Sequence, residues 1–353
     1  MISVILLGNF GGTSASEILS SMVGQPNVET ILIAKTRPAA LEANYKFIPT
    51  GQSSISSCIS IAAGMATGDT VVFVDGRSSV KDGNWEKLLA SIDSSTGLTW
   101  FDVEADGHEI ELDESSPEGM LHALTNDNAI PTACVAIRSS LLPRSEMPEG
   151  ETSSEILAQL MIQVIGTQET TARGEVIVSA PADSCQLSDK SRAVCLKTLV
   201  NASNIEDMFP RHDWNTHEKE SAAAAYHSIA ALFIRLGETE SAMDCLRLSD
   251  QLEDSPRSLA LKGLIASDRG EILGAVANMV SSLQQYELRK KENEIHYSQF
   301  QPTDLEVINE NLNAGLQALN KRDNQRALNH FAEAVFNFDP FYSKYGVARL
   351  RAA

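Results

Sequence analysis

Two carboxylates and one arginine are the side chains of this sequence best placed for chemistry. Asp75 ends the apolar run Thr70–Val74, and Arg77 follows two residues later. Glu155 stands near the start of the amphipathic stretch SSEILAQLMIQVIG. A guanidinium pairs well with phosphate oxygens, and a suitably placed carboxylate can take a proton from a hydroxyl. We therefore begin from these three side chains, whose types can bind phosphate and transfer protons.

A glycine-rich turn and a basic turn are the next candidates. Gly8, Asn9 and Gly11 follow the first apolar run, and Lys35 and Arg37 follow the second. Glycines before a helix can cradle a phosphate, but a tight strand-to-helix turn needs the same residues. The basic pair could likewise face a phosphate or lie in a solvated turn. Both alternatives stay open from the sequence.

Strands of a parallel sheet are expected to position these residues. The apolar runs 2–7, 30–34 and 70–74 are typical of buried strands, and 16–22 is typical of a helix between the first two. Strand, helix and strand within about 35 residues form a βαβ unit, which implies parallel pairing. Ligands of such sheets bind beyond the carboxyl ends of the strands, where Asp75 lies.

The stretch 62–89 has the order Ala-x-Gly-Asp, apolar strand, Asp, short loop and amphipathic helix. It resembles family 2 glycosyltransferases of the GT-A fold, and the resemblance extends over about residues 2–180. The implied fold class is α/β, with a Rossmann-like, mostly parallel sheet. The implied donor is a nucleotide sugar, with Mg²⁺ or Mn²⁺ as a weakly bound metal ion. Strands are expected over 98–103 and 109–112, on either side of the turn Ala105-Asp106-Gly107, and they form an acidic, exposed hairpin.

In that family the strand ends in Asp-x-Asp, which holds the metal and the diphosphate. Here the residues are Asp75-Gly76-Arg77, so the resemblance leaves Asp75 as the metal ligand and places Arg77 where a second carboxylate would be. It makes Glu155 the catalytic base, although a glutamate in a first helical turn also interacts favourably with the helix dipole. The family's base-binding aspartate is not matched near Lys35. The implied nucleotide contacts are Gly8, Asn9, Gly11, Lys35 and Asp75.

The second half of the chain predicts helical repeats. Three helix-turn-helix segments carry small residues 12 positions apart, namely Ala230 and Ala242, Gly263 and Ala275, and Gly315 and Ala327. The interval from Ala242 to Ala275 is 33 residues. This periodicity is similar to that of tetratricopeptide repeats, whose paired helices cross closely at small residues. We expect an all-α solenoid over 219–353, with a capping helix over 342–350.

Composition limits the partners. The formal net charge is −19, so broad electrostatic binding of nucleic acid or anionic lipid is not expected. No apolar run approaches the ~20 residues of a membrane span, and the five scattered cysteines contain no C-x-x-C pair. We expect a cytoplasmic protein with reduced thiols, whose partners are a nucleotide-sugar donor and a protein. A homo- or hetero-oligomer is compatible with the sequence.

Three functions are compatible with the sequence to different extents. The first is transfer of a sugar from a nucleotide sugar to a protein or glycan acceptor, with the repeats binding the acceptor or a partner. The alternative is a catalytically degenerate glycosyltransferase-fold scaffold. A third interpretation, a Rossmann-like oxidoreductase, has support only in the first 40 residues.

The expected domain division is a glycosyltransferase-like domain over 1–180, a connector over 181–218, and the helical repeats over 219–353.

Overall fold

The computed structural model describes the chain apart from residues 9–17, 20, 23–24, 38–44, 52, 81–83, 113–114, 127–128, 144–145, 168, 292–301, 349 and 351–353, and apart from the side chains of 289–291 and 302–304. The chain divides into two compact units, Met1–Met208 and Phe209–Ala353. This division falls inside the expected connector 181–218. Each unit is described by itself below.

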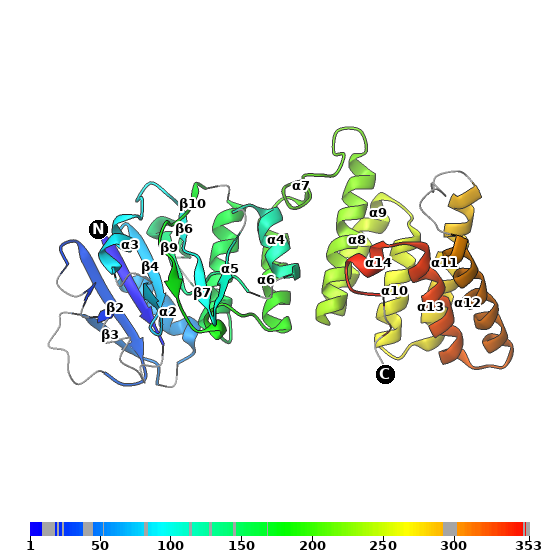
Figure 1. Ribbon diagram of the computed structural model, residues 1–353, viewed down its shortest axis with the longest axis horizontal. Coiled ribbons are helices and arrows are strands. Elements are labelled where there is room, and N and C mark those ends of the chain that lie inside the picture. The colour runs from blue at the N-terminus through cyan, green and yellow to red at the C-terminus, as the bar shows by residue number, and fades with distance from the viewer. Residues whose placement is uncertain are drawn as a thin grey trace. The chain divides into compact units, whose positions relative to one another are not determined.

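The first unit is built from strands and helices that alternate along much of its length (Figure 1). Its described elements are β1 (Ile2–Leu7), β2 (Val28–Ala34), β3 (Lys46–Pro49), α2 (Ile55–Met65), β4 (Thr70–Asp75), β5 (Ser79–Val80), α3 (Trp85–Ala90), β6 (Leu98–Trp100), β7 (Val103–Ala105), β8 (His108–Ile110), α4 (Pro117–Asn126), β9 (Cys134–Arg138), the 3₁₀ turn η1 (Ser139–Leu141), α5 (Ser153–Gly166), β10 (Thr171–Arg173), β11 (Val178–Ser179), the 3₁₀ turn η2 (Ala182–Ser184), α6 (Asp189–Ala202) and α7 (Ile205–Met208).

The main sheet is mixed, and most of its described pairings are parallel. Its described strands lie in the order β10-β6-β9-β4-β1-β2-β3. β1 pairs in parallel with β2 and β4, and β2 with β3, whereas β9 runs antiparallel between β4 and β6. All six residues of β4 are buried, as expected for a β-branched run covered on both faces. The α/β class with a Rossmann-like, mostly parallel sheet, expected from the sequence, is confirmed.

A second, smaller sheet contains the expected acidic hairpin. Its described order is β5-β11-β7-β8, and β7 and β8 pair antiparallel around Asp106 and Gly107, whose φ angles are 50° and 81°. The run 98–103, expected to be one strand, is divided: β6 joins the main sheet, and β7 joins the hairpin. The break at Phe101 and Asp102 lets one segment serve two sheets.

Helix α6 belongs to the first unit through its packing and through one buried arginine. It lies beside α5 (Figure 1). Arg192, 5% exposed, donates from Nε to the carbonyl of Leu124 at 2.9 Å and from Nη2 to that of Thr125 at 3.0 Å. Carbonyls in the last turn of a helix lack intrahelical donors, so Arg192 satisfies the end of α4 with a charge that also suits the helix dipole.

The second unit is helical throughout its described elements. These are α8 (Glu218–Leu236), α9 (Thr239–Leu252), α10 (Pro256–Asp268), α11 (Ile272–Lys291), α12 (Pro302–Asn320), α13 (Asn324–Phe338) and α14 (Phe341–Lys344). They form three helical hairpins, α8/α9, α10/α11 and α12/α13 (Figure 1). The helical C-terminal region expected from the sequence is thereby confirmed.

The small residues sit where the helices of a pair touch. A Cβ atom on Gly263 would lie 3.1 Å from Met279 Cε, and one on Gly315 would lie 2.6 Å from Phe331 Cε1. The hairpins do not stack uniformly, since α10 lies against α8 and α9 whereas the third hairpin meets α11 through its second helix, α13. The tetratricopeptide character of this unit therefore remains a prediction.

The end of the second unit differs from the expected capping helix over 342–350. Helix α14 ends at Lys344, and Gly346 takes a φ of 69°, which turns the chain out of the helical direction. A buried network holds this end: Arg257 donates from Nε to Asp339 Oδ2 at 2.6 Å, and Tyr286 donates to the same oxygen at 3.0 Å.

The described helices include none with the length and apolar character needed to cross a bilayer. All five cysteines lie in described parts of the chain, where they are buried and free. Burial raises the pKa of the Cys185 thiol to about 11 and that of Cys245 to about 12. Such thiols are inert at neutral pH, because the thiolate is the reactive form.

Candidate functional site

Asp75 lies where β4 meets the end of β1. In the register of the two strands it is opposite Leu7, and its N–H donates to the carbonyl of Ala133 at 2.8 Å. The next N–H, of Gly76, donates to the carbonyl of Leu7 at 2.6 Å. The backbone thus fixes Asp75 at the carboxyl edge of the sheet, as the sequence predicted.

The Asp75 carboxylate accepts four hydrogen bonds. Oδ1 accepts from the N–H of Arg77 at 2.8 Å and from its Nε at 3.1 Å. Oδ2 accepts from Arg77 Nη2 at 2.8 Å and from Ser184 Oγ at 2.7 Å. Burial raises the pKa of Asp75, but the bonds from Arg77 and Ser184 together outweigh it and hold the pKa below its usual range.

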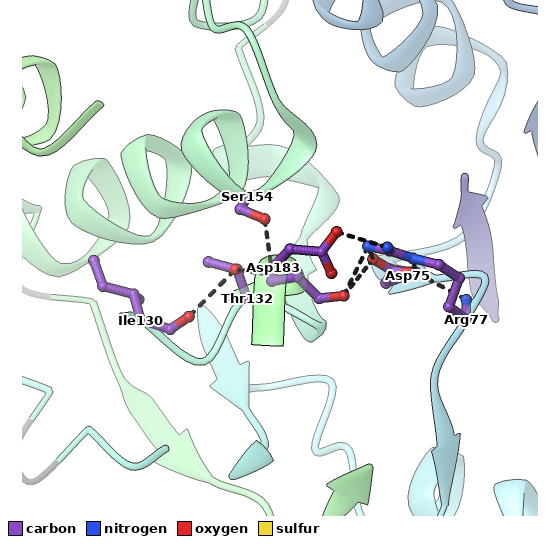
Figure 2. A network of polar contacts seen from close by, with 7 residues as sticks. Asp75, Arg77, Ile130, Thr132, Ser154 and Asp183 are labelled. Atoms are coloured by element: carbon purple, nitrogen blue, oxygen red, sulfur yellow. Dashed lines mark hydrogen bonds and ion pairs between the residues drawn. The ribbon is translucent and has the colours of Figure 1, made fainter. Parts of the chain in front are cut away.

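Arg77 connects this buried carboxylate to an exposed one. Its Nη1 donates to Asp183 Oδ2 at 2.8 Å, and Figure 2 shows the guanidinium between the two carboxylates. The side chains of Arg77 and Asp183 are 40% and 68% exposed, whereas that of Asp75 is 10% exposed. The hydrogen bond to Asp75 is the leading cause that raises the pKa of Arg77, so this guanidinium stays charged at all accessible pH values.

Ser184 links the network to the start of α5. Its carbonyl accepts from Thr132 Oγ1 at 2.8 Å and from Ser154 Oγ at 2.8 Å (Figure 2). Both donors are nearly inaccessible to solvent. Segments that precede β9, begin α5 and form η2 therefore converge behind Asp75.

The residues around Asp75 do not fit a divalent metal ion. A carboxylate offers about four lone-pair positions, and four donors fill those of Asp75. In the family that the sequence resembles, a second carboxylate would ligate Mg²⁺ or Mn²⁺. Arg77 stands at that position here, and a guanidinium cannot ligate a cation. Arg77 and Ser184 thus occupy the coordination positions that a metal ion would need.

Another carboxylate group has the spacing of a metal site but already faces a cation. Ligand atoms of Asp102, Glu109 and Glu111 lie within 4.8 Å of one another. Arg173 donates from Nε to Asp102 Oδ2 at 2.7 Å, and its Nη2 lies 3.2 Å from Glu111 Oε2. We therefore describe this group as an ion-pair cluster.

Gly8 lies beside Asp75, and its conformation requires glycine. Its φ is 141°, and a Cβ there would lie 3.7 Å from Gly76 N and 3.9 Å from Asp75 Oδ1. Lys35 is in the exposed turn after β2 and forms no ion pair within the described parts of the chain. Asn9 and Gly11 lie outside the described residues.

Arg37 has a partner in its own segment. Its Nε lies 3.4 Å from the hydroxyl of Tyr45, and its guanidinium stacks 5.4 Å from the centre of that ring. This arrangement favours the solvated-turn alternative for Arg37.

Glu155 is in the first turn of α5, and its carboxylate bonds to residues outside the Asp75 network. Its N–H donates to the N-cap hydroxyl of Thr152 at 3.2 Å. Its Oε2 accepts from the N–H of Glu151 and from Ser191 Oγ, both at 3.1 Å. This is a variant of the capping box, in which a first-turn glutamate returns to an N–H before the helix.

Glu155 also lines a cleft. It is 5% exposed, and the cleft beside it is bordered by α2, α6 and the segment 146–151. Neighbouring side chains on one helical turn therefore serve two places: Ser154 supports Asp75 through Ser184, and Glu155 borders the cleft.

The structure brings Gly8, Asp75 and Arg77 together. Glu155 is not part of this group, but the preceding residue, Ser154, is linked to Asp75 through Ser184. Sequence reasoning missed Asp183 and Ser184, which fell in the expected connector and are more than 100 residues from their partners. The one available signal was the Asp-Ser pair after Pro181. Nothing in its spacing points to Asp75.

No family model and no curated protein sequence matches the chain. Solved structures with a similar course of the backbone include residues 1–349 of TarS from S. aureus (14% identity, TM-score 0.42), over 94% of this chain and 90% of that one. The same TarS segment in complex with UDP-GlcNAc has 13% identity and a TM-score of 0.42, with the same coverage. Glucosyl-3-phosphoglycerate synthase from Mycobacterium tuberculosis, in complex with Mn²⁺, UDP and phosphoglyceric acid, has 15% identity and a TM-score of 0.40, over 57% of this chain and 78% of that one. Resemblances at this level assign no ligand to this chain.

Proposed function

We propose that the first unit is a glycosyltransferase-like domain that binds a nucleotide-sugar donor at the edge formed by Gly8 and Asp75. The observation that carries this proposal is the position of Arg77, whose half-exposed guanidinium is held at the carboxyl end of β4 by two side-chain bonds to Asp75. A guanidinium fixed by one carboxylate presents its remaining N–H groups in a set direction. Such a group can bind diphosphate oxygens without a metal ion.

The bond to Asp183 is the one that a donor would replace. Both of its partners are well exposed, and exposed ion pairs contribute only about 0–1 kcal/mol. In the proposed complex Arg77 keeps Asp75 and exchanges Asp183 for a phosphate oxygen, a charge-assisted bond of similar geometry. Gly8 leaves room for the ligand beside Asp75, and Lys35, on the neighbouring strand end, adds a second cation. Asn9 and Gly11 remain predicted contacts.

Glu155 is the proposed base for an acceptor hydroxyl. Its Oε2 has two donors, which fix the orientation of the carboxylate. Its Oε1 has no hydrogen-bond partner within the described parts of the chain and is free to accept from a ligand. A positioned base of this kind typically contributes ~10²–10⁴-fold to rate.

A catalytically degenerate scaffold is the second candidate, and one observation favours it. Around the guanidinium of Arg77 stand the two carboxylates Asp75 and Asp183, so the site as folded has an excess of negative charge. A diphosphate must displace Asp183 from Arg77 before the guanidinium can attract it. If that exchange does not occur, the fold supports binding of partners only.

For the helical unit we propose a tetratricopeptide-like role in binding a protein partner or acceptor that carries basic residues. The 12-residue spacing of small residues and their close contacts with the paired helix support this proposal. The excess of acidic residues in the chain favours a basic partner. A cytoplasmic location, in which buried thiols stay reduced, is part of the same proposal.

Thermal shift and calorimetry with UDP-, GDP-, CMP- and dTDP-sugars in EDTA test the first function. We expect one nucleotide to bind without metal, and transfer or hydrolysis to fall by ~10²-fold or more in Arg77→Ala and Glu155→Gln. Glu175→Gln, an exposed carboxylate of the same unit, is the control. If no nucleotide sugar binds at millimolar concentration, the enzymatic proposal fails and the scaffold candidate stands.

A further inference from the structure

The ion-pair cluster around Arg173 lies on one face of the β7–β8 hairpin. The ladder pairs Glu104 with Glu109, and the same register, continued along both strands, places Glu111 opposite Asp102. Side chains alternate between the two faces of a strand, so all four carboxylates share one face. Like charges directly opposite each other destabilise a ladder. Two such pairs on one short hairpin indicate that a cation offsets their repulsion.

Arg173 supplies part of the positive charge. It donates from Nε to Asp102 Oδ2 at 2.7 Å, and its Nη2 lies 3.2 Å from Glu111 Oε2. Glu109 is exposed and has no ion-pair partner among the residues that the structure describes. Three carboxylates against one guanidinium leave two negative charges in the cluster. A divalent cation would balance them.

The carboxylate of Asp102 has a buried oxygen without a partner, which is an observation independent of net charge. Nε and Nη2 of Arg173 both contact Oδ2, whereas Oδ1 is closed to solvent and accepts no hydrogen bond within the described parts of the chain. In the pair of Arg77 and Asp75, by contrast, the guanidinium bonds to both carboxylate oxygens, as is usual. Buried polar atoms in folded proteins are nearly always satisfied, so Asp102 Oδ1 is a candidate ligand atom.

The Asp102 side chain is aimed into the cluster. It is 5% exposed, and one of its oxygens lies within 4.8 Å of carboxylate oxygens of Glu109 and Glu111. A cavity of about 560 Å³ borders the two glutamates, and its lining also includes His122 of α4. Such a cavity admits an ion together with the water molecules that complete its coordination.

We propose that Asp102, Glu109 and Glu111 bind a calcium ion. Ca²⁺ takes ~6–8 oxygen ligands at ~2.3–2.6 Å in a flexible geometry, which suits one fixed carboxylate and two exposed glutamates, with water as the remaining ligand. Mg²⁺ requires a near-ideal octahedron, and zinc and copper favour imidazole or thiolate ligands, which these three side chains do not offer. A bare ion can also reach the enclosed Oδ1 of Asp102, whereas a lysine or arginine side chain of a partner is bulkier.

The ion would tie the hairpin to the junction of the two sheets. Asp102 lies at the break between β6 of the main sheet and β7 of the smaller one, and Arg173 ends β10, at the edge of the main sheet. The proposed role is therefore structural, in that bound Ca²⁺ stabilises the hairpin. The site shares no residue with the edge at Asp75, so it does not depend on the proposed function.

Calorimetry of the full chain with calcium chloride, after treatment with a chelator and without nucleotide, tests the proposal. We expect one site per chain with a dissociation constant of about 10⁻³ M or lower, and binding of Mg²⁺ that is weaker by about tenfold or more. The temperature of thermal unfolding should rise with the calcium concentration, as expected for a ligand of the folded state.

Two variants and a matched control locate the site. Asp102→Asn and the double variant Glu109→Gln/Glu111→Gln should each weaken Ca²⁺ binding about tenfold or more, because each removes ligand charge. The double variant changes only exposed residues, so it remains informative if Asp102→Asn unfolds. Asp106→Asn, in the turn of the same hairpin, removes a carboxylate outside the cluster and keeps a residue type that tolerates a φ of 50°. It should leave the affinity unchanged to within about twofold.

Absence of saturable Ca²⁺ binding up to about 10 mM, or an unchanged affinity in the double variant, would overturn the proposal. A loss in Asp106→Asn as large as that in the double variant would show that only the net charge of the hairpin attracts the ion, and would overturn it too. Tighter binding of Mg²⁺ than of Ca²⁺ would overturn the choice of metal. Binding of tri-lysine that the double variant abolishes, without Ca²⁺ binding, would assign the cluster to a cationic partner instead.

Discussion

Arg77 and Asp75 are joined by two side-chain hydrogen bonds, from Nη2 to Oδ2 at 2.8 Å and from Nε to Oδ1 at 3.1 Å. The guanidinium and Ser184 thereby take the positions from which a cation would contact the carboxylate. Replacing Arg77 tests whether the Asp75 carboxylate can bind a metal ion once the guanidinium is absent.

Removing the guanidinium should open Asp75 to a metal ion. In Arg77→Ala the carboxylate keeps the donors at the backbone of residue 77 and at Ser184, and about half of its lone pairs become available. We expect Mn²⁺, with a nucleoside diphosphate present, to bind about tenfold or more tightly than in the parent chain, a change of ~1.4 kcal/mol. Calorimetry measures it. The gain should vanish in Asp75→Asn/Arg77→Ala, and tight metal binding that survives Asp75→Ala in the parent background would contradict the assignment.

The acid stability of the sheet should depend on Glu29. Burial raises the pKa of this carboxyl, but hydrogen bonds from Lys46, Ser3 and Thr67 outweigh it and lower the pKa from 4.5 to about 2. Because the folded-state pKa is the lower one, the stabilisation is complete above pH 4.5 and is lost as the pH falls toward 2.

Glu29→Gln should therefore flatten this part of the pH profile. We expect the variant to be less stable than the parent by about 1–2 kcal/mol at pH 6, with the gap closing as the pH approaches 2. Urea unfolding of both proteins at several pH values gives the difference, with Glu175→Gln as the control. A gap that stays constant with pH would show that packing, and not the charge of Glu29, is responsible.

The close helix crossings of the second unit give a matched pair of glycine substitutions. A Cβ at Gly315 would lie 2.6 Å from Phe331 Cε1, whereas Gly274, in α11, has no atom within 4 Å of such a Cβ. We expect Gly315→Ala to destabilise the unit by about 1–3 kcal/mol, because the buried ring must move. Gly274→Ala should be neutral or stabilising by up to about 1 kcal/mol, because alanine is the better helix former. Thermal unfolding that ranks them in the opposite order would refute the helix pairing.

The sequence was most informative where a local pattern decides the structure. The run 70–75 is apolar and β-branched, and it is a fully buried strand that ends at Asp75. The spacing of Gly315 and Ala327 correctly indicated a crossing of α12 and α13.

Partners that depend on distant parts of the chain could not be predicted. Asp183 and Ser184 reach Asp75 and Arg77 across more than 100 residues, in a segment whose prolines and aspartates are typical of a connector. Likewise, Ser191 reaches Glu155 only because α6 packs on α5. The cleft beside Glu155 is likewise lined by separate segments, namely α2, 146–151, α5 and α6.

The end of the first unit gives the last prediction. A fragment of residues 1–180 loses Asp183, Ser184 and α6. With them it loses one of the two donors to Asp75 Oδ2, one of the two donors to Glu155 Oε2, and the cap that Arg192 provides for α4. Each lost buried hydrogen bond to a charged group costs about 1–3 kcal/mol, and the packing of α6 on α5 is lost as well, so together these losses approach the ~5–15 kcal/mol total stability of a domain. A fragment of residues 1–208 keeps all of them.

We therefore expect limited proteolysis of the full chain to cut first within 209–217 and to release a stable fragment close to 1–208. The isolated fragment 1–208 should unfold cooperatively in urea, and fragment 1–180 should be unfolded or several kcal/mol less stable. Arg192→Ala in fragment 1–208 tests the cap alone, and exposed Glu175→Gln is its control. If fragment 1–180 is as stable as 1–208, η2 and α6 are dispensable, and the boundary of the folded unit lies at 180 as the sequence division has it.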